Sequence, residues 1–310
     1  MALPPDLQAL AARVSNWGRW GPDDERGTLN LIDAAAVRRG VAAATAGKVF
    51  SLAMPFGPDG PQDGTIPGRD NPVVRNTMAN VSFTGDTDDV CFNDDRFDMG
   101  TQAATHWDAL SHVSYGGLLY NGIDAGAVTE AGGASRLGID RFGPVVSRGL
   151  LCDVARLHGV EAFDDGHPIS GDELDACVTA AGLTVQPGDI ICVRTGQFRW
   201  LRPDLDKLRF RYPTPGLGVT SLEWLHDHDV AAVATDTFVL ECFPAEDPSV
   251  MLPVHMINLR DIGLVQGQLW WLDDLAADCA DDGRCEFLLT ATPLPLAGAA
   301  GGPVAPTAVK

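Results

Sequence analysis

Four residues within the stretch 102–112 (QAATHWDALSH) could hold a metal ion or move a proton: Gln102, His106, Asp108 and His112. Imidazole nitrogens, carboxylates and amide oxygens suit Zn²⁺ or Mn²⁺ as ligands. An ion with an open coordination position activates a water and polarises a carbonyl, while an unligated histidine nearby moves protons. The spacing fits equally well a hydrogen-bonded histidine beside a turn-forming aspartate, so both interpretations stay open from the pattern alone.

The local conformation decides whether His106 and Asp108 can act together. Alternate residues of an extended strand share one face, whereas in a helix the two side chains would lie about 200° apart. Thr105 and Trp107 have side chains that favour strands. We therefore expect a strand that presents His106 and Asp108 on the same face.

A straight strand cannot gather all four residues. At roughly 3.3 Å per residue, Gln102 and His106 would be about 13 Å apart, too far to share an ion. The chain must fold back at Ala103 and Ala104, whose small side chains permit close approach, and His112 must turn in over the site. The sequence therefore predicts a short strand with a bend on each side.

The elements around this stretch follow from periodicity, capping and turn residues. Ser170 and Glu173 have capping-box spacing at the start of one helix, and Asp33 is a suitable N-cap for another. The polar, Pro/Gly-rich loop 57–80 is long enough to be a lid or an oligomer contact. We expect helices in 33–47, 169–182, 221–229 and the second part of 264–283, strands in 48–56, 144–156, 187–196 and 230–237, and a hairpin in 81–100.

Composition limits the class of protein. The 310 residues are 45% hydrophobic, and no apolar run approaches the roughly 20 residues that cross a membrane. The N-terminus does not resemble a signal peptide, and seven widely spaced cysteines without a CxxC pair indicate reduced thiols, so we expect a cytoplasmic protein. The formal charge of −20 argues against a nucleic-acid partner. We expect the partner of this protein to be a small-molecule substrate.

The chain shows no internal repeat and no clear linker, which predicts one mixed α/β domain spanning 1–310. Within it, 1–32 is expected to form an N-terminal arm or loop. The Pro/Gly/Ala-rich segment 293–310 is expected to lie as a tail over the surface.

The motif resembles the HxGTHxDxPxH signature of the metal-dependent cyclase/formamidase family, which includes bacterial kynurenine formamidase and isatin hydrolase. The resemblance extends to NWGRWGPDDERGTLNLI, RGLLCDVAR, GDIICVRTG, ATDTFVLECFP and PVHMINL followed by QGQLWWLDDLA. It implies the swivelling β/β/α fold, with mixed sheets in a barrel-like core and helices outside. It also implies a homodimer or homotetramer whose subunits contribute to each other's pockets.

The resemblance implies a role for each matching residue. His106 and Asp108 would be metal ligands, His112 the general acid/base, and His255 the later histidine of the site. The late glutamate of the family falls on Gln268, or less favourably on Gln266.

This sequence departs from the signature at both ends of the ligand set. Gln102 replaces the first ligand histidine and a glutamine replaces the late glutamate, while Ala104 and Leu110 replace the glycine and the proline. A neutral amide is a weaker ligand than imidazole or carboxylate. We therefore expect at most one divalent ion, Zn²⁺ or Mn²⁺, held by Gln102, His106 and Asp108 and completed by Gln268 or else by His255. The catalytic residues are expected to be His112 and His255.

Three functions follow as hypotheses. The first is a metal-dependent hydrolase that opens a cyclic or aryl amide or a lactone. The second is a cyclase, dehydratase or lyase that uses His and Asp for acid–base chemistry with little or no metal dependence. The third is a small-molecule binding protein without catalysis.

Other motifs and residues give weaker evidence for a function. There is no GxSxG elbow, phosphate-binding loop or dinucleotide fingerprint. Glu241 and Asp236 could line a pocket or be ordinary buried carboxylates. His158 and His167 lie in an expected loop without a recognisable partner pattern.

Overall fold

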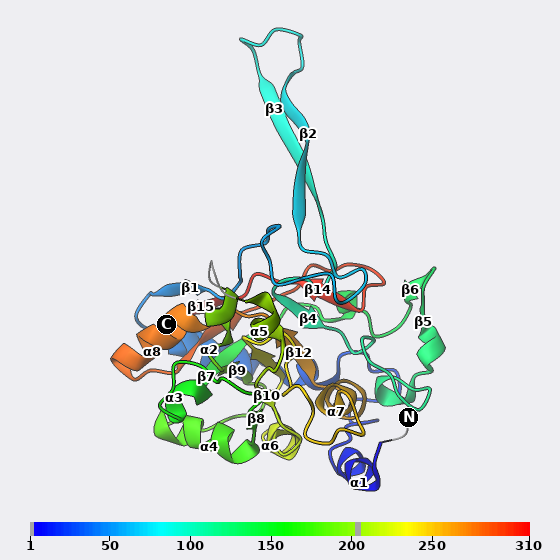
Figure 1. Cartoon of the computed structure of the whole chain (residues 1–310), viewed down its shortest axis with the longest axis vertical. Helices are drawn as coiled ribbons and strands as arrows, with labels where there is room; N and C mark the ends of the chain where they lie inside the picture. Colours follow the sequence, from blue (N-terminus) through cyan, green and yellow to red (C-terminus); the bar gives the residue numbers. More distant parts are fainter. Residues whose placement is uncertain (1–2, 202–205) are drawn as a thin grey trace.

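A computed structural model describes residues 3–201 and 206–310. Within these residues, nine strands form one mixed sheet that curls into an open half-barrel, with helices outside it (Figure 1). The expected fold class is confirmed. The strands of the sheet, in spatial order, are β1 (Val49–Ser51), β15 (Thr307–Val309), β13 (Glu286–Thr290), β7 (Val146–Asp153), β9 (Ile190–Arg194), β11 (Ala232–Thr235), β12 (Val265–Gln268), β4 (His106–Asp108) and β14 (Gly301–Pro303).

The centre of the sheet is parallel and its two sides are antiparallel. Strands β7, β9, β11 and β12 run parallel to their neighbours in that series, and every other pair in the sheet is antiparallel. Apolar side chains cover both faces of the central strands: Ile190 and Cys192 of β9 enter one core cluster, and Ile191 and Val193 enter the other. Such strands read as continuous apolar runs in the sequence, which is why these ones were predictable.

The remaining elements surround this sheet. Separate two-stranded pairs are β2 (Val73–Ser82) with β3 (Cys91–Asp98), β5 (Val128–Thr129) with β6 (Gly133–Ala134), and β8 (Pro168–Ile169) with β10 (Gly216–Leu217). The α-helices are α1 (Pro5–Arg13), α2 (Ala34–Ala43), α3 (Val154–Leu157), α4 (Gly171–Ala180), α5 (Lys207–Arg211), α6 (Ser221–Asp227), α7 (Pro253–Met256) and α8 (Asp273–Asp282). Short 3₁₀ turns are η1 (Gly27–Leu31), η2 (Tyr120–Gly122), η3 (Ala125–Ala127), η4 (Ile139–Arg141) and η5 (Gln197–Leu201), and η6 (Ile257–Ile262) is a π-helix.

Most expected elements are present. Asp33 caps α2 by accepting from the amides of Ala35 and Ala36, and Ser170 and Glu173 form a complete capping box at α4. Strands β1, β7, β9 and β11 and helices α6 and α8 lie within their expected ranges. Among the described residues, no helix is long and apolar enough to cross a membrane.

Two expectations were wrong. The segment 73–80 was assigned to a loop, but it belongs to β2, so the hairpin begins at Val73 and projects far from the body of the molecule (Figure 1). The segment 293–310 was assigned to a surface tail, but β14 pairs with β4, and β15 lies between β1 and β13. Its glycines and prolines suggested a loop, whereas the backbone completes the sheet.

Candidate active site

Strand β4 places the two central residues of the site. It is only three residues long and lies between β12 and β14. His106 and Asp108 share one face, and both are fully buried. Trp107 points to the other face, where its ring packs edge-to-face on Trp270 with centroids 4.8 Å apart, which anchors the strand.

The chain turns on both sides of β4, as expected from the length of a straight strand, which could not bring Gln102 and His112 to the site. The amide of Ala103 donates to the carbonyl of Gly100 at 3.0 Å, and the amide of His112 donates to the carbonyl of Ala109 at 2.9 Å. The expected short strand between two bends is therefore present.

His106 and Asp108 face each other as two acceptors. The Nδ1 of His106 lies 2.7 Å from the carbonyl oxygen of Ala104. A carbonyl oxygen only accepts, so Nδ1 carries the proton and Nε2 presents a lone pair. This Nε2 lies 3.4 Å from Oδ1 of Asp108, and neither atom has a hydrogen-bond partner among the described residues.

The other oxygen of Asp108 accepts from two amides of β12. Gln268 donates from Nε2 to Oδ2 at 2.6 Å, and Gln266 donates to the same oxygen at 3.2 Å. Both come from one face of β12, because Gln266 and Gln268 pair with Asp108 and His106 across the antiparallel ladder. Gln268, the favoured match to the family glutamate, therefore lies in the site and presents its amide nitrogen.

Three imidazoles surround Asp108. Nε2 of His112 lies 3.6 Å from Oδ1, and Nε2 of His255 lies 4.0 Å from Oδ2. Burial by itself raises the pKa of Asp108, but His112, His106 and His255 outweigh burial and the pKa is lowered. Burial lowers the pKa of His112, although Asp108 opposes this. Positive charge on the neighbouring imidazoles, or on a cation in their place, therefore favours the ionised form of Asp108.

Glu241 fixes the orientation of His255. Its Oε1 accepts from Nδ1 and from the backbone amide of His255, and its Oε2 accepts from the amide of Val254 at 3.0 Å. With Nδ1 as donor, Nε2 of His255 presents a lone pair, which lies 3.2 Å from the amide nitrogen of Gln268. Glu241 could have been either a pocket residue or an ordinary buried carboxylate, and the structure assigns it to the site.

Gln102 lies at the edge of this group. Its Oε1 accepts from the hydroxyl of Thr101 at 2.7 Å. Its amide nitrogen lies beside Gly301, since a Cβ there would be 2.5 Å from Nε2. Gly301 pairs with Asp108, so the amide of Gln102 lies on the Asp108 face of the sheet.

Asp236 has a different role. Its carboxylate accepts from the amides of Thr195, Gly196 and Gln197 and from the Thr195 hydroxyl, at 2.7–3.3 Å. Burial raises its pKa to about 6. Asp236 therefore holds the turn that follows β9.

Two residues of the site escaped the sequence interpretation. The carboxylate of Asp108 raises the pKa of Arg69, but burial has the larger effect and lowers it. The charge of Arg69 in turn helps to lower the pKa of His112. Asn258, which is fully buried in η6, donates to Oε1 of Gln266 at 3.5 Å. The one available signal for Arg69 was its place in the long loop beside Gly68, and the neighbourhood of His255 pointed to Asn258.

The residues present fit a divalent ion. Nε2 of His106 and Oδ1 of Asp108 are two buried lone-pair atoms that repel each other unless a cation or a proton lies between them. Imidazole and carboxylate together form a donor set for Zn²⁺ or Mn²⁺. Gln268 would join the ligands only after its amide rotates to present oxygen.

Comparisons with known proteins show the family and the fold of the chain. Residues 49–241 match the model of the Cyclase family. A solved structure described as a novel cyclase is 38% identical, covers 100% of both chains and has a TM-score of 0.88. No curated protein sequence matches the chain significantly.

More distant solved structures share the fold. An isatin hydrolase bound to the product analogue thioisatinate is 17% identical over 89% of this chain and 98% of its own, with a TM-score of 0.63. A predicted metal-dependent hydrolase from Bacillus stearothermophilus is 17% identical over 84% of this chain and 97% of its own, with a TM-score of 0.50. Because the family model spans more than half of the sequence and the novel cyclase matches along its whole length, the chain belongs to the cyclase family.

Proposed function

We propose that the chain is a metal-dependent hydrolase that opens a cyclic or aryl amide, or a lactone. The observation that carries the proposal is the facing pair of His106 Nε2 and Asp108 Oδ1, 3.4 Å apart and without other partners in the described part of the chain. These two residues would hold the ion, with Gln268 and Gln102 as further ligands. A bound Zn²⁺ or Mn²⁺ supplies an activated water and polarises the substrate carbonyl.

His112 is the general acid/base in this proposal. Its lowered pKa keeps the imidazole neutral at neutral pH, ready to accept a proton from the attacking water. The same nitrogen then returns the proton to the leaving nitrogen or oxygen. Arg69, whose charge acts on Asp108 and His112, would stabilise the negative charge that develops on the carbonyl oxygen.

His255 is the second acid/base residue. The bond from its Nδ1 to Glu241 fixes the tautomer and leaves the Nε2 lone pair on the side of Asp108. A mainly apolar cavity of about 750 Å³ is lined by residues 113–116, which follow His112 in the chain, and by Met251, Leu252 and Met256, which flank His255 in the chain. In this proposal the cavity would admit an aromatic or cyclic substrate.

Ring opening of a cyclic amide tests the proposal. Chelator-treated protein is incubated with isatin or an aryl formamide, with and without Mn²⁺ or Zn²⁺, in H₂¹⁸O. We expect metal-dependent turnover, one ¹⁸O in the new carboxylate or formate, and, in His106→Ala, loss of activity and of the one equivalent of metal that the active site holds. Undiminished activity in His106→Ala would refute the mechanism.

A specific observation keeps a second function in view. Gln266 and Gln268 both donate to Asp108 Oδ2, so two neutral amides stabilise this carboxylate without an ion. A cyclase, dehydratase or lyase using Asp108, His112 and His255 would exploit such a site. Turnover that survives EDTA and leaves no ¹⁸O in the product selects this function over hydrolysis.

A further inference from the structure

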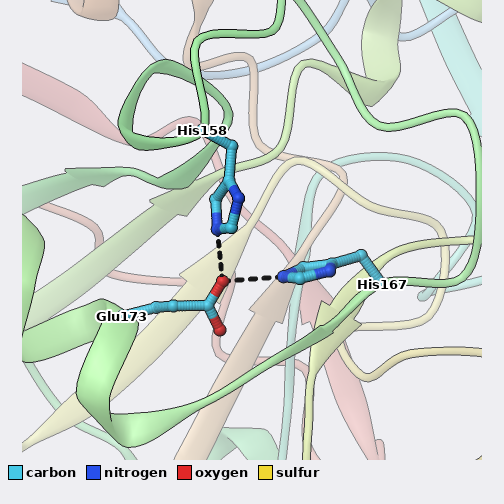
Figure 2. Close-up of side chains that lie close together, drawn as sticks. All are labelled: His158, His167 and Glu173. Atoms are coloured by element: carbon cyan, nitrogen blue, oxygen red, sulfur yellow. Dashed lines mark hydrogen bonds and ion pairs between the residues drawn. The ribbon is translucent and has the colours of Figure 1, made fainter.

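A second cluster of metal-binding side chains lies away from the active site. His158 follows α3, His167 precedes β8, and Glu173 belongs to the first turn of α4. Figure 2 shows both imidazoles directed at one carboxylate oxygen of Glu173. The Nε2 atoms of His158 and His167 lie 2.6 and 2.7 Å from Oε1, and the three candidate ligand atoms all lie within 4.8 Å of one another.

The capping box of α4 holds the carboxylate in place. Oε2 of Glu173 accepts from the amide of Ser170 at 2.7 Å and from its hydroxyl at 2.8 Å. This leaves Oε1 for the two histidines. Burial opposes ionisation, but the bonds from Ser170, His167 and His158 lower the pKa of Glu173 to about 2. Glu173 is therefore a fixed, charged acceptor.

Packing positions both rings. The His167 ring stacks on Phe163 with centroids 4.4 Å apart and planes 1° apart. The His158 ring meets Phe163 edge-on at 5.4 Å and His167 at 5.0 Å. The side chain of His158 is 39% exposed, so solvent reaches the cluster directly.

The chemistry of these donors is that of a zinc-type site. Two imidazoles and one carboxylate, with a remaining position for water, are a common donor set for Zn²⁺. We propose that His158, His167 and Glu173 bind one divalent ion of the zinc class at a site separate from the active site. Bonds of about 2.0–2.1 Å in tetrahedral geometry place the ligand atoms roughly 3.3 Å apart. The two Nε2 atoms then move roughly 0.6–0.7 Å away from Oε1, and each Nε2 releases its proton.

The surrounding charge attracts a cation. The segment 159–166 between the two histidines contains Glu161, Asp164 and Asp165 and neither Lys nor Arg. The whole chain carries a formal charge of −20. Both raise the local concentration of divalent cations.

Binding would fasten this loop to α4. The loop also contacts the segment after β9, where the amide of Phe163 donates to the carbonyl of Thr195 at 3.4 Å. Arg209 of α5 donates to the carbonyl of Asp164 at 2.9 Å. An ion at the cluster would therefore stiffen a contact between α4 and the segment around η5 and α5.

Zinc stoichiometry tests the proposal. The unmodified chain, His158→Ala and His167→Ala are dialysed against Zn²⁺ and analysed for metal content and thermal stability. We expect each variant to bind one ion fewer per chain, or to bind the cluster ion more than about tenfold more weakly, and to lose the part of the zinc-induced rise in Tm that this site provides. Unchanged stoichiometry and affinity in both variants overturn the proposal.

Two further variants separate this site from the active site and from general histidine binding. His106→Ala, which removes the proposed catalytic ligand, should still bind one Zn²⁺, and addition of His167→Ala to it should abolish that binding. His226→Ala is the matched control, because His226 is another surface histidine paired with a carboxylate, that of Asp227, outside the cluster. Loss of zinc equal to that of His167→Ala in this control contradicts the assignment. Glu173→Gln retains side-chain size while removing the charge and should weaken zinc binding without removing either histidine.

Discussion

Asp108 is the residue on which the candidate active site converges. Its Oδ1 lies within 3.4–3.6 Å of two histidine nitrogens, and its Oδ2 accepts from two glutamines. A fully buried carboxylate is costly unless it is compensated, and here the compensation is divided between neutral amides and imidazoles. The glutamines stabilise the charge directly, while the Oδ1 side remains open for a cation.

The first prediction concerns Gln268→Glu. Without metal, the new carboxylate lies beside Asp108 in a buried site, so like charges repel and Tm falls. With Zn²⁺ or Mn²⁺ the second carboxylate becomes a ligand, so the rise in Tm on adding metal exceeds that of the unmodified chain. Thermal unfolding with and without metal measures both effects.

Gln197→Glu is the control for this prediction. Gln197 is also a buried glutamine, but it lies in η5 near the backbone of Phe210. The Gln197→Glu variant should show the same fall in Tm, relative to the unmodified chain, with and without metal. If Gln268→Glu behaves like this control, Gln268 is not adjacent to a metal position.

The second prediction treats Glu241 as a positioning residue. Glu241→Gln replaces one acceptor oxygen by an NH₂ group among three donors, which leaves a buried donor unpaired at a cost of about 1–3 kcal/mol. We expect kcat to fall about 10–100-fold with a smaller change in KM, because His255 loses its fixed tautomer. In a His255→Ala background the same substitution should leave kcat unaffected. An equal loss of kcat in both backgrounds would show that Glu241 acts independently of His255.

At the scale of elements, the sequence indicated those strands and helices whose pattern is set by burial. Strand β9 reads as an apolar run because both of its faces are covered, and α4 is marked by its capping box. Strand β14 carries no such pattern. Gly301 is required there because a Cβ would lie 2.5 Å from the amide of Gln102 and 2.9 Å from the carbonyl of Trp107. Close approach of two backbones leaves only a glycine, which by itself suggests a loop.

The residues of the active site also divide into those that the sequence predicted and those that it did not. His106 and Asp108 were predictable because strand periodicity fixes which face they share, and His255 followed from the family resemblance. Arg69 was not, because its position depends on how a long loop folds over the sheet, which local pattern does not encode. The cluster of His158, His167 and Glu173 was missed for a similar reason: the turn between α3 and β8 brings together residues with no regular spacing.

The third prediction tests how tightly the supporting elements hold the site. A Cβ on Gly216 of β10 would lie 2.4 Å from the carbonyl carbon of Glu241 and from the oxygen of Leu240. Gly216→Ala must therefore displace the segment that orients His255. We expect a loss of about 1–3 kcal/mol in the free energy of unfolding, together with a lower kcat.

Gly57→Ala is the matched control, because a Cβ there meets nothing within 4 Å. Its denaturation midpoint and kcat should remain unchanged. Leu217 of β10 pairs with Glu241 through an isolated β-bridge. An unchanged kcat in Gly216→Ala despite lower stability would show that this bridge stabilises the fold but does not orient His255.

At the scale of the whole molecule, the sheet is completed by distant parts of the chain. Within the described residues, strand β1 pairs only with β15, and β4, the strand of the active site, lies between β12 and β14, so residues near position 300 support both sides of the sheet. Lys310 is fully buried and pairs with Asp278 and Asp282 of α8. Such long-range closure is invisible to local sequence patterns, which explains the wrong assignment of 293–310.

The final prediction concerns the projecting hairpin of β2 and β3. Isolated two-stranded hairpins are marginally stable in water. This one exposes several large apolar side chains, among them Val74, Phe83, Val90 and Phe97. We propose that a second copy of the chain covers them, in agreement with the homo-oligomer that the family resemblance implies.

Charges at the tip of the hairpin should therefore dissociate the assembly. Phe83 is 75% exposed and Val90 is 56% exposed, so Phe83→Asp with Val90→Asp places two charges where burial against a partner is required. We expect light scattering to give a multiple of 32.8 kDa for the unmodified chain and a lower mass for the double variant. Val41→Asp, at an equally exposed valine on α2, should keep the mass of the unmodified chain. A monomeric unmodified chain, or a double variant of unchanged mass, would rule out the hairpin as the oligomer contact.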